Sequence, residues 1–276
     1  MTLLIVTPTL GRSRFLEETV NCIYRLDASI QHIISCPRDQ IAVLQERFPL
    51  SRVVADQGRE GGIYGAINAG LSAARERWDF FTYLNDDDLL GQGFGTMFKR
   101  HAMASNRDTV AYGRISNIDK SGRILMGMTV GPDPRHYPAL LQMGISPTGQ
   151  QGMIFGREVV GALGFYSTRY KLCGDLDYWC RAMAAGFRFV FYPVEAGKFR
   201  MHEGQLSSDI ETTRRELVQI TNVHFPREAS AVEKLHAKVI YRLYNAPRYI
   251  QRITKWGLKS SYQLLESKGY AGSCLL

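Results

Sequence analysis

Three consecutive carboxylates, Asp86, Asp87 and Asp88, follow directly on the apolar run Phe80–Leu84. Carboxylates this close repel one another, and a divalent cation stabilises them. Mg²⁺ or Mn²⁺ with oxygen ligands suits the pattern, especially where a diphosphate supplies further ligands. The alternative is a solvated acidic turn that caps the next helix. The apolar strand before the triplet favours the metal site, because ligands of open α/β sheets bind at the carboxyl ends of strands.

A glycine-rich stretch, residues 56–70, is the second segment suited to phosphate chemistry. Gly58, Gly61 and Gly62 precede a helical pattern, and backbone N–H groups in such a loop can approach a phosphate at the helix N-terminus. The spacing matches neither the dinucleotide-binding GxGxxG nor the phosphate-loop GxxxxGK[ST] pattern. This argues against a dinucleotide-dependent enzyme and against a P-loop nucleotide hydrolase.

The elements that must position these residues alternate along the first 90 residues. Short apolar strands alternate with amphipathic helices, which predicts βαβ units and a parallel sheet. The pattern then changes to a hairpin with a turn at Asp119–Gly122, and it ends in helices broken by Pro226 and Pro247. Strands are predicted at 2–7, 30–35, 52–55, 80–84, 109–118, 123–130, 152–156 and 187–192, and helices at 13–24, 39–48, 63–77, 157–163, 176–185 and from 209 onward.

Composition is that of an ordinary globular protein, with 45% apolar and 22% charged residues. The chain carries a formal net charge of +8. Residues 226–276 contribute +6 of this charge, with nine basic and three acidic groups. Its five cysteines form no CxxC pair, and neither a secretory signal nor a membrane span is recognisable, so we expect free thiols in a cytoplasmic protein.

The order of the motifs resembles the family 2 glycosyltransferases, which have the GT-A fold. The resemblance covers roughly residues 1–208 and implies a mostly parallel central sheet flanked by helices, with a helical C-terminal tail. The segments that carry it are Ile5–Thr9, Gly62–Gly70, Leu84–Asp88 (the DxD region, with Asn85 first), Gly152–Phe155 with Gly164–Phe165, Cys173–Arg181 and Phe199–Ser207.

The resemblance implies roles for individual residues. Asp87 is the principal metal ligand, Asp86 lies near the ribose and the metal, and Asp175 is the general base that deprotonates the acceptor. Asp88 and His202 are further candidate metal ligands for Mn²⁺ or Mg²⁺. The donor-binding candidates are Thr7, Pro8, Thr9, Asp56, Gly62, Tyr64, Asn68, Asp86 and Arg200.

Structural alternatives stand beside these roles. Asp175 could be a plain helix N-cap, His202 a structural histidine, and Arg200 a partner of a surface carboxylate. Two segments also depart from the family pattern. Ser35–Pro37 lacks the usual base-reading Asp, for which Asp56 could substitute, and Thr148–Gln151 has no His on the acceptor side.

These motifs predict a metal-dependent inverting glycosyltransferase that uses a nucleotide-diphosphate sugar and a glycan or lipid-linked acceptor. We expect residues 1–118 to form the nucleotide-sugar half, 119–208 the acceptor and catalytic half of the same domain, and 209–276 a basic helical extension. A non-catalytic nucleotide-sugar or glycan-binding relative is the alternative. A nucleotidyltransferase ranks lower, because Gly11–Arg14 only faintly resembles its loop.

The basic extension has three interpretations. Its helix packs on the body with solvated charges, or it makes peripheral contact with an anionic membrane at the inner face of the plasma membrane, or it binds nucleic acid. The last is disfavoured because no nucleic-acid-binding module is present. The basic and aromatic residues that suggest a membrane include Lys234, Lys238, Arg242, Arg248, Arg252, Lys255, Trp256 and Lys259.

Overall fold

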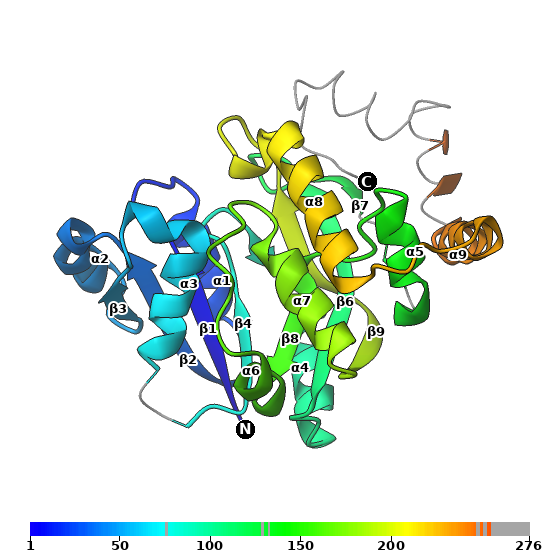
Figure 1. Ribbon diagram of the computed structural model, residues 1–276. Coiled ribbons are helices and arrows are strands. Elements are labelled where there is room, and N and C mark those ends of the chain that lie inside the picture. The colour runs from blue at the N-terminus through cyan, green and yellow to red at the C-terminus, as the bar shows by residue number, and fades with distance from the viewer. Residues whose placement is uncertain (75–76, 128–129, 132, 247–248, 251–252, 255–276) are drawn as a thin grey trace.

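The computed structural model describes residues 1–74, 77–127, 130–131, 133–246, 249–250 and 253–254. Within these residues one nine-stranded sheet runs in the order β3-β2-β1-β4-β8-β6-β9-β5, and β7 pairs with β6 (Figure 1). The strands are β1 Thr2–Pro8, β2 Ser29–Cys36, β3 Arg52–Ala55, β4 Phe80–Tyr83, β5 Leu89–Leu90, β6 Thr109–Ile118, β7 Ile124–Gly127, β8 Met153–Gly156 and β9 Arg188–Arg200.

The first four strands in this order form the predicted parallel sheet. Strands β2 and β4 flank β1, and β3 flanks β2, all in parallel register. Beyond β4 the sheet is mixed, because β8 runs antiparallel to both β4 and β6, whereas β9 runs parallel to β6. The predicted hairpin is confirmed as β6 and β7 over the described residues. The carboxyl ends of β1 and β4 therefore meet at one edge.

Helices cover both faces of the sheet. Leu4 and Val6 of β1 pack on the side of α3, α6 and α7, and Leu3 and Ile5 pack on the side of α1 and α4. Burial on both faces explains why β1 is continuously apolar. The α-helices are α1 Leu16–Tyr24, α2 Ile41–Arg47, α3 Gly62–Ser72, α4 Phe94–Met103, α5 Tyr137–Gln142, α6 Arg157–Leu163, α7 Gly174–Ala184, α8 Ile210–His224 and α9 Ala231–Tyr244.

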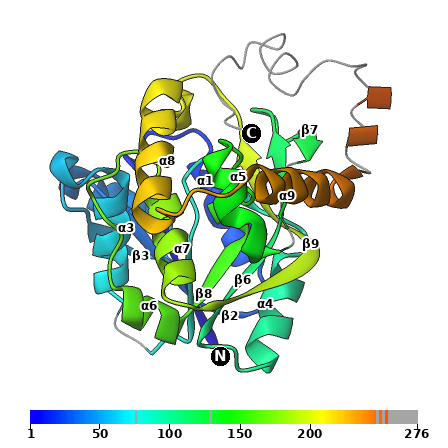
Figure 2. The same ribbon diagram turned by 45° about the vertical axis from the view of Figure 1, so that its right-hand side comes forward.

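The C-terminal extension is helical where it is described, as predicted. Helix α8 packs against α7, and α9 lies beside α5 at the periphery of the molecule (Figures 1 and 2). Asn245 holds the end of α9 in place, because its amide exchanges two hydrogen bonds of 3.1 Å with the backbone of Val130. The predicted basic and aromatic residues Arg248, Arg252, Lys255, Trp256 and Lys259 lie outside the described residues. None of the described helices is long and apolar enough to cross a bilayer.

Two buried histidines sit inside this core. His32 of β2 lies between Thr7 Oγ1, at 3.0 Å from Nε2, and Ser51 Oγ, at 2.7 Å from Nδ1. Burial lowers the pKa of His32 to about 3 and that of His101, on α4, to about 4. Both side chains are therefore neutral in the folded protein near pH 6, whereas histidines of the unfolded chain begin to take up protons there.

Acid should therefore destabilise the fold through these histidines. The unfolded state binds more protons than the native state between about pH 6.5 and the lowered pKa, so stability falls as the pH falls through that window. For His32 we expect a loss of about 2 kcal/mol between pH 6.5 and pH 4.5. Urea denaturation of His32→Gln at several pH values should show a shallower pH dependence. The exposed His236→Gln variant serves as control, and an unchanged slope in His32→Gln would contradict this account.

Candidate active site

The candidate site lies where β1 and β4 end. The backbone N–H of Leu84 donates to Val6 O at 2.9 Å, and the hydroxyl of Thr9 donates to Asp86 Oδ2 at 2.5 Å. Ser13 donates its hydroxyl to Asp86 O at 3.0 Å. These bonds join the loop after β1 to the carboxylate triplet and place Thr9, one of the predicted donor-binding residues, beside Asp86.

The three carboxylates have different environments. Asp86 is largely buried, and burial raises its pKa to about 6, although the hydrogen bond from Thr9 favours the charged form. Asp87 is partly exposed, and its Oδ2 lies 2.9 Å from His202 Nε2. This contact joins residues 115 positions apart in the chain. The structure therefore brings together two of the predicted metal ligands.

His202 is held in a defined orientation. Its Nδ1 lies 2.8 Å from Glu203 O, an acceptor, and its Nε2 faces the Asp87 carboxylate, a second acceptor. The hydrogen bond with Asp87 raises the pKa of His202, because it favours the imidazolium that donates from both nitrogens.

Asp88 points away from Asp87 into the protein. The side chain is fully buried, and its Oδ1 accepts from the backbone N–H of Arg200 at 2.9 Å. Its Oδ2 accepts from the amides of Gln151 at 2.8 Å and Asn85 at 3.3 Å. Burial raises the pKa of Asp88, while these three donors favour the carboxylate. Both oxygens already have protein partners, in contrast to the predicted role as a metal ligand.

Arg200 is likewise buried, in contrast to the predicted contact with a diphosphate. Its Nε donates to Asp87 O at 2.7 Å, and Nη2 donates to Glu18 Oε2 at 2.6 Å. Nη1 lies 3.3 and 3.4 Å from the carbonyl oxygens of Asp119 and Lys120. The guanidinium thus connects the triplet, α1 and the β6–β7 turn. Its ion pair with Glu18 is the contact with a carboxylate that the structural alternative for Arg200 describes.

A substitution separates these two roles of Arg200. Arg200→Lys keeps the charge but cannot reach Glu18 and the turn carbonyls together, so we expect a loss of about 2–4 kcal/mol in unfolding free energy without ligand. Arg123→Lys, an exposed side chain that pairs with Asp119 at the same turn, is the control and should change stability by less than about 1 kcal/mol. Unchanged stability of Arg200→Lys in urea would favour the diphosphate role instead.

The chemistry of Asp86, Asp87 and His202 fits a divalent cation. Carboxylate oxygens suit Mn²⁺ or Mg²⁺, and the imidazole nitrogen would be one further ligand beside water or phosphate oxygens. No group of three or more His, Cys, Asp and Glu side chains forms a preassembled metal site among the described residues.

Asp175, the predicted base, lies in the first turn of α7. The cap position is Cys173, so the N-cap alternative for Asp175 is wrong. Tyr64 Oη lies 3.2 Å from Asp175 Oδ1 and 2.8 Å from Leu172 O. Burial raises the pKa of Asp175, opposed by hydrogen bonds from the Leu176 N–H and Tyr64. A carboxyl whose pKa is raised is a better proton acceptor than an ordinary surface aspartate.

Packed tyrosines place Asp175 near the end of β4. Tyr166 stacks on Tyr64 with ring centroids 5.9 Å apart, and it meets Tyr83 edge-on at 5.6 Å. Asn68 fixes the backbone of Tyr166 with hydrogen bonds of 2.8 and 2.9 Å. Tyr64 and Asn68 are both buried. The structure thus gives them supporting positions under the site, in contrast to the predicted direct contact with the donor.

Glu216 of α8 is a site residue that the sequence pattern did not reveal. Its buried carboxylate accepts three backbone N–H groups, from Lys171 at 2.8 Å and from Leu172 and Cys173 at 2.9 Å each. These residues form the loop that leads into Asp175. A second contact, His224 Nε2 to Asp177 Oδ1 at 2.9 Å, also ties α8 to α7. Helix α8 therefore fixes the position of the candidate base.

Glu216→Gln should loosen this loop, because an amide has one oxygen and cannot replace three charge-assisted hydrogen bonds. We expect unfolding free energy to fall by about 2–3 kcal/mol. Amide exchange measured by NMR or mass spectrometry should accelerate at residues 171–173. Glu211→Gln, an exposed position on the same helix, is the matched control. Unchanged exchange at the loop in Glu216→Gln would show that the carboxylate does not hold it.

The donor-side candidates at the ends of β1 and β3 differ in accessibility. Thr7 is fully buried and its hydroxyl faces His32, and Pro8 is buried as well, so neither side chain is directed to a ligand. Asp56 is half-buried beside the end of β2, where its N–H donates to Cys36 O at 2.8 Å. Its position next to the segment that lacks the usual Asp agrees with the substitution suggested above.

Gly62 begins α3 with a φ of +57°, a conformation that favours glycine. A Cβ at this position would meet nothing within 4 Å. The backbone of the first turn of α3 is therefore approachable, as the glycine-rich pattern predicts.

The acceptor-side segment supports the site through its glutamines. Gln150 donates its amide to Tyr83 O, and Gln151 donates to Asp88 as described. The Oε1 of Gln150 and the Oδ1 of Asn85 are buried without a partner among the described residues.

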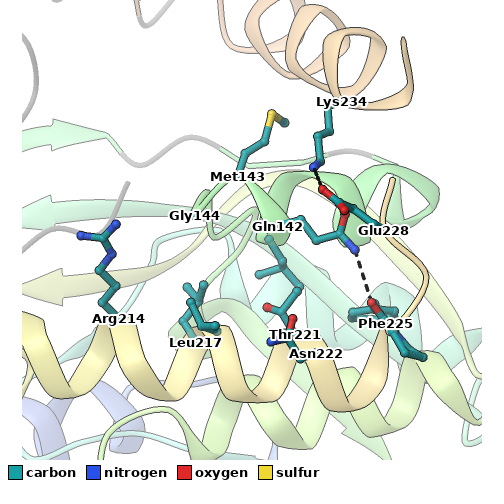
Figure 3. Close-up of a pocket in the computed structure, with 13 residues that line it drawn as sticks. Gln142, Met143, Gly144, Arg214, Leu217, Thr221, Asn222, Phe225, Glu228 and Lys234 are labelled. Atoms are coloured by element: carbon teal, nitrogen blue, oxygen red, sulfur yellow. Dashed lines mark hydrogen bonds and ion pairs between the residues drawn. The ribbon is translucent and has the colours of Figure 1, made fainter. Parts of the chain in front are cut away.

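A separate cavity of about 500 Å³ lies between α5, α8 and the segment that leads to α9 (Figure 3). Leu217 and Thr221 line its α8 side, and the Lys234–Glu228 ion pair lies at its α9 side. None of the predicted site residues lines it. The cavity is on the opposite side of α8 from the loop that Glu216 holds.

Comparison with known proteins identifies the fold. The chain matches no protein family by sequence, and no curated protein sequence resembles it significantly. Solved structures do resemble it. Residues 1–349 of S. aureus TarS in complex with UDP-GlcNAc superpose with a TM-score of 0.61 at 14% identity, over 98% of this chain and 80% of that one. The chain has the GT-A fold.

Two further structures agree. The mannosyltransferase PcManGT from Pyrobaculum calidifontis, in complex with GDP-Man and Mn²⁺, gives a TM-score of 0.58 at 16% identity, over 97% of this chain and 79% of that one. Longer S. aureus TarS gives 0.58 at 15% identity, and this chain spans only 44% of its length. The GT-A expectation from the sequence motifs is thus confirmed by structures to which the chain has little sequence similarity.

Proposed function

We propose that the protein is a metal-dependent glycosyltransferase that moves a sugar from a nucleotide-diphosphate donor to a hydroxyl of a glycan or lipid-linked acceptor. The observation that carries the proposal is the contact between Asp87 and His202 in the loop after β4, beside Asp86, together with the buried carboxyl of Asp175 that Tyr64 contacts. The fold shared with proteins bound to UDP-GlcNAc and to GDP-Man with Mn²⁺ supports it.

Asp87 and His202 would hold the cation, with Asp86 beside it, and the cation would neutralise charge on the departing diphosphate. Thr9 and Arg200 fix the carboxylate loop, so that it need not reorganise when the donor binds. Asp175 would accept the proton from the acceptor hydroxyl as its oxygen forms the bond to the anomeric carbon and the diphosphate leaves from the opposite face. This displacement makes the reaction inverting.

The first experiment identifies the sugar donor. A thermal-shift panel of UDP, GDP and dTDP sugars, with and without Mn²⁺, should reveal one donor that raises the melting temperature only with metal, because binding to the native state stabilises it. Asp87→Asn should abolish this metal-dependent shift. The exposed Asp39→Asn variant, which keeps the site intact, should behave like the wild type.

Asp175→Asn separates binding from chemistry. It should retain the thermal shift with donor and metal but lower sugar transfer at least about 100-fold, because a general base contributes that much. Transfer is followed by release of the nucleoside diphosphate in the presence of acceptor. Full activity of both Asp87→Asn and Asp175→Asn would refute the assigned roles. Donor binding by a wild-type protein that neither transfers nor hydrolyses the sugar would favour the non-catalytic alternative.

A further inference from the structure

Helix α9 carries an exposed aliphatic stripe. Val232, Leu235, Val239 and Leu243 recur at spacings of three and four residues, which places them along one side of the helix. Their exposed fractions are 76%, 64%, 43% and 67%. A surface helix that packs on the body normally turns its aliphatic side toward the core. Instead, the structure turns these residues outward.

The opposite side of α9 fixes this orientation. Ala237, Tyr241 and Asn245 follow one another at intervals of four residues, and all three are buried. At 100° per residue they lie roughly opposite the stripe. Asn245 is bonded to Val130 through its whole amide group. The exposed stripe is therefore a fixed feature of the surface, held outward by specific contacts on the other side.

Basic residues flank the stripe. Lys238 and Arg242 are exposed, and neither forms an ion pair with any other described residue. Beyond α9, the described Ile250 and Ile253 are also exposed, by 62% and 43%. The sequence from 234 to 265 contains no acidic residue and seven basic ones, namely Lys234, Lys238, Arg242, Arg248, Arg252, Lys255 and Lys259.

This charge pattern distinguishes between possible partners of the stripe. Two copies of α9 packed along the stripe would bring Lys238 and Arg242 of both copies together, while the nearest acidic side chains, Glu228 and Glu233, are already paired with Lys234 and Arg227. An anionic bilayer offers the complementary charge and an apolar layer beneath it, which is what a basic amphipathic helix requires.

We propose that the outward side of α9 docks on an anionic membrane, with the four aliphatic side chains in the interfacial layer and Lys238 and Arg242 against lipid phosphates. This inference rests on the proposed function and deepens it, because membrane docking favours a lipid-linked acceptor over a free glycan. A helix that lies in the interface would keep the enzyme beside an acceptor held in the same membrane.

Vesicle binding tests the surface without donor or acceptor, so its result is independent of whether the protein transfers sugar. The full chain is sedimented with sucrose-loaded vesicles of phosphatidylcholine alone or with one-quarter phosphatidylglycerol. We expect binding to the anionic vesicles that is at least tenfold stronger and that weakens at high salt.

Two double variants separate the apolar and electrostatic parts. Leu235→Gln with Leu243→Gln should reduce binding more than tenfold. Lys238→Gln with Arg242→Gln should reduce it about 25-fold, since each basic residue near the surface contributes about fivefold. Val43→Gln with Leu50→Gln removes equally exposed aliphatic groups on and beside α2 and should bind like the wild type. Thermal melts confirm that each variant is folded.

Three results would overturn the proposal. One is equal binding to neutral and anionic vesicles, or binding to neither. Another is undiminished binding of the Leu235→Gln/Leu243→Gln variant, which would mean that the stripe does not reach the lipid. The third is a wild-type dimer in light scattering that this variant converts to a monomer, which would assign the stripe to a second copy of the chain.

Discussion

The candidate site depends on one buried interaction, in which the carboxylate of Asp88 accepts hydrogen bonds from the backbone of Arg200 and from the side chain of Gln151. Asp88 has no exposed surface, so its carboxylate must be hydrogen-bonded, and its partners come from β9 and from the segment before β8. Arg200 in turn holds the carbonyl of Asp87 and the side chain of Glu18. One buried acid and one buried base therefore fix the loop that follows β4 from three sides.

This constraint divides three identical side chains into three roles. With Asp88 committed to the interior, Asp87 faces His202 and Asp86 faces Thr9, so neighbouring carboxylates point in different directions and repel one another less. Supporting side chains also surround Asp175. Tyr64 contacts its carboxylate, and Glu216 holds the loop before it. Most of the side chains that the sequence suggested as ligand-binding groups are therefore buried. They hold in place the few candidate residues that remain accessible.

Sequence patterns were sufficient to predict the fold, and the candidate site stays a prediction. The continuously apolar β1 and the alternation of strands and helices predicted the parallel half, and the Asp triplet after β4 predicted that the candidate site lies at the carboxyl edge of this half. The direction of each side chain was not predictable. Asn68, Arg200 and Asp88 carry groups that can bind a ligand, and only tertiary contacts show that these groups are already occupied.

The contacts of Glu216 cross the boundary that the motifs placed at residue 208. They join α8, in the extension, to the loop before Asp175, in the domain that carries the motifs. A glutamate in the middle of a helix has no sequence feature that marks it as buried, and its three partners lie more than 40 residues earlier in the chain. Helix α8 nevertheless connects two surfaces, because its inner side holds the loop before Asp175 and its outer side lines the cavity next to α9. Helix α8 thus lies between the loop before the candidate base and the cavity that Lys234 of α9 also lines.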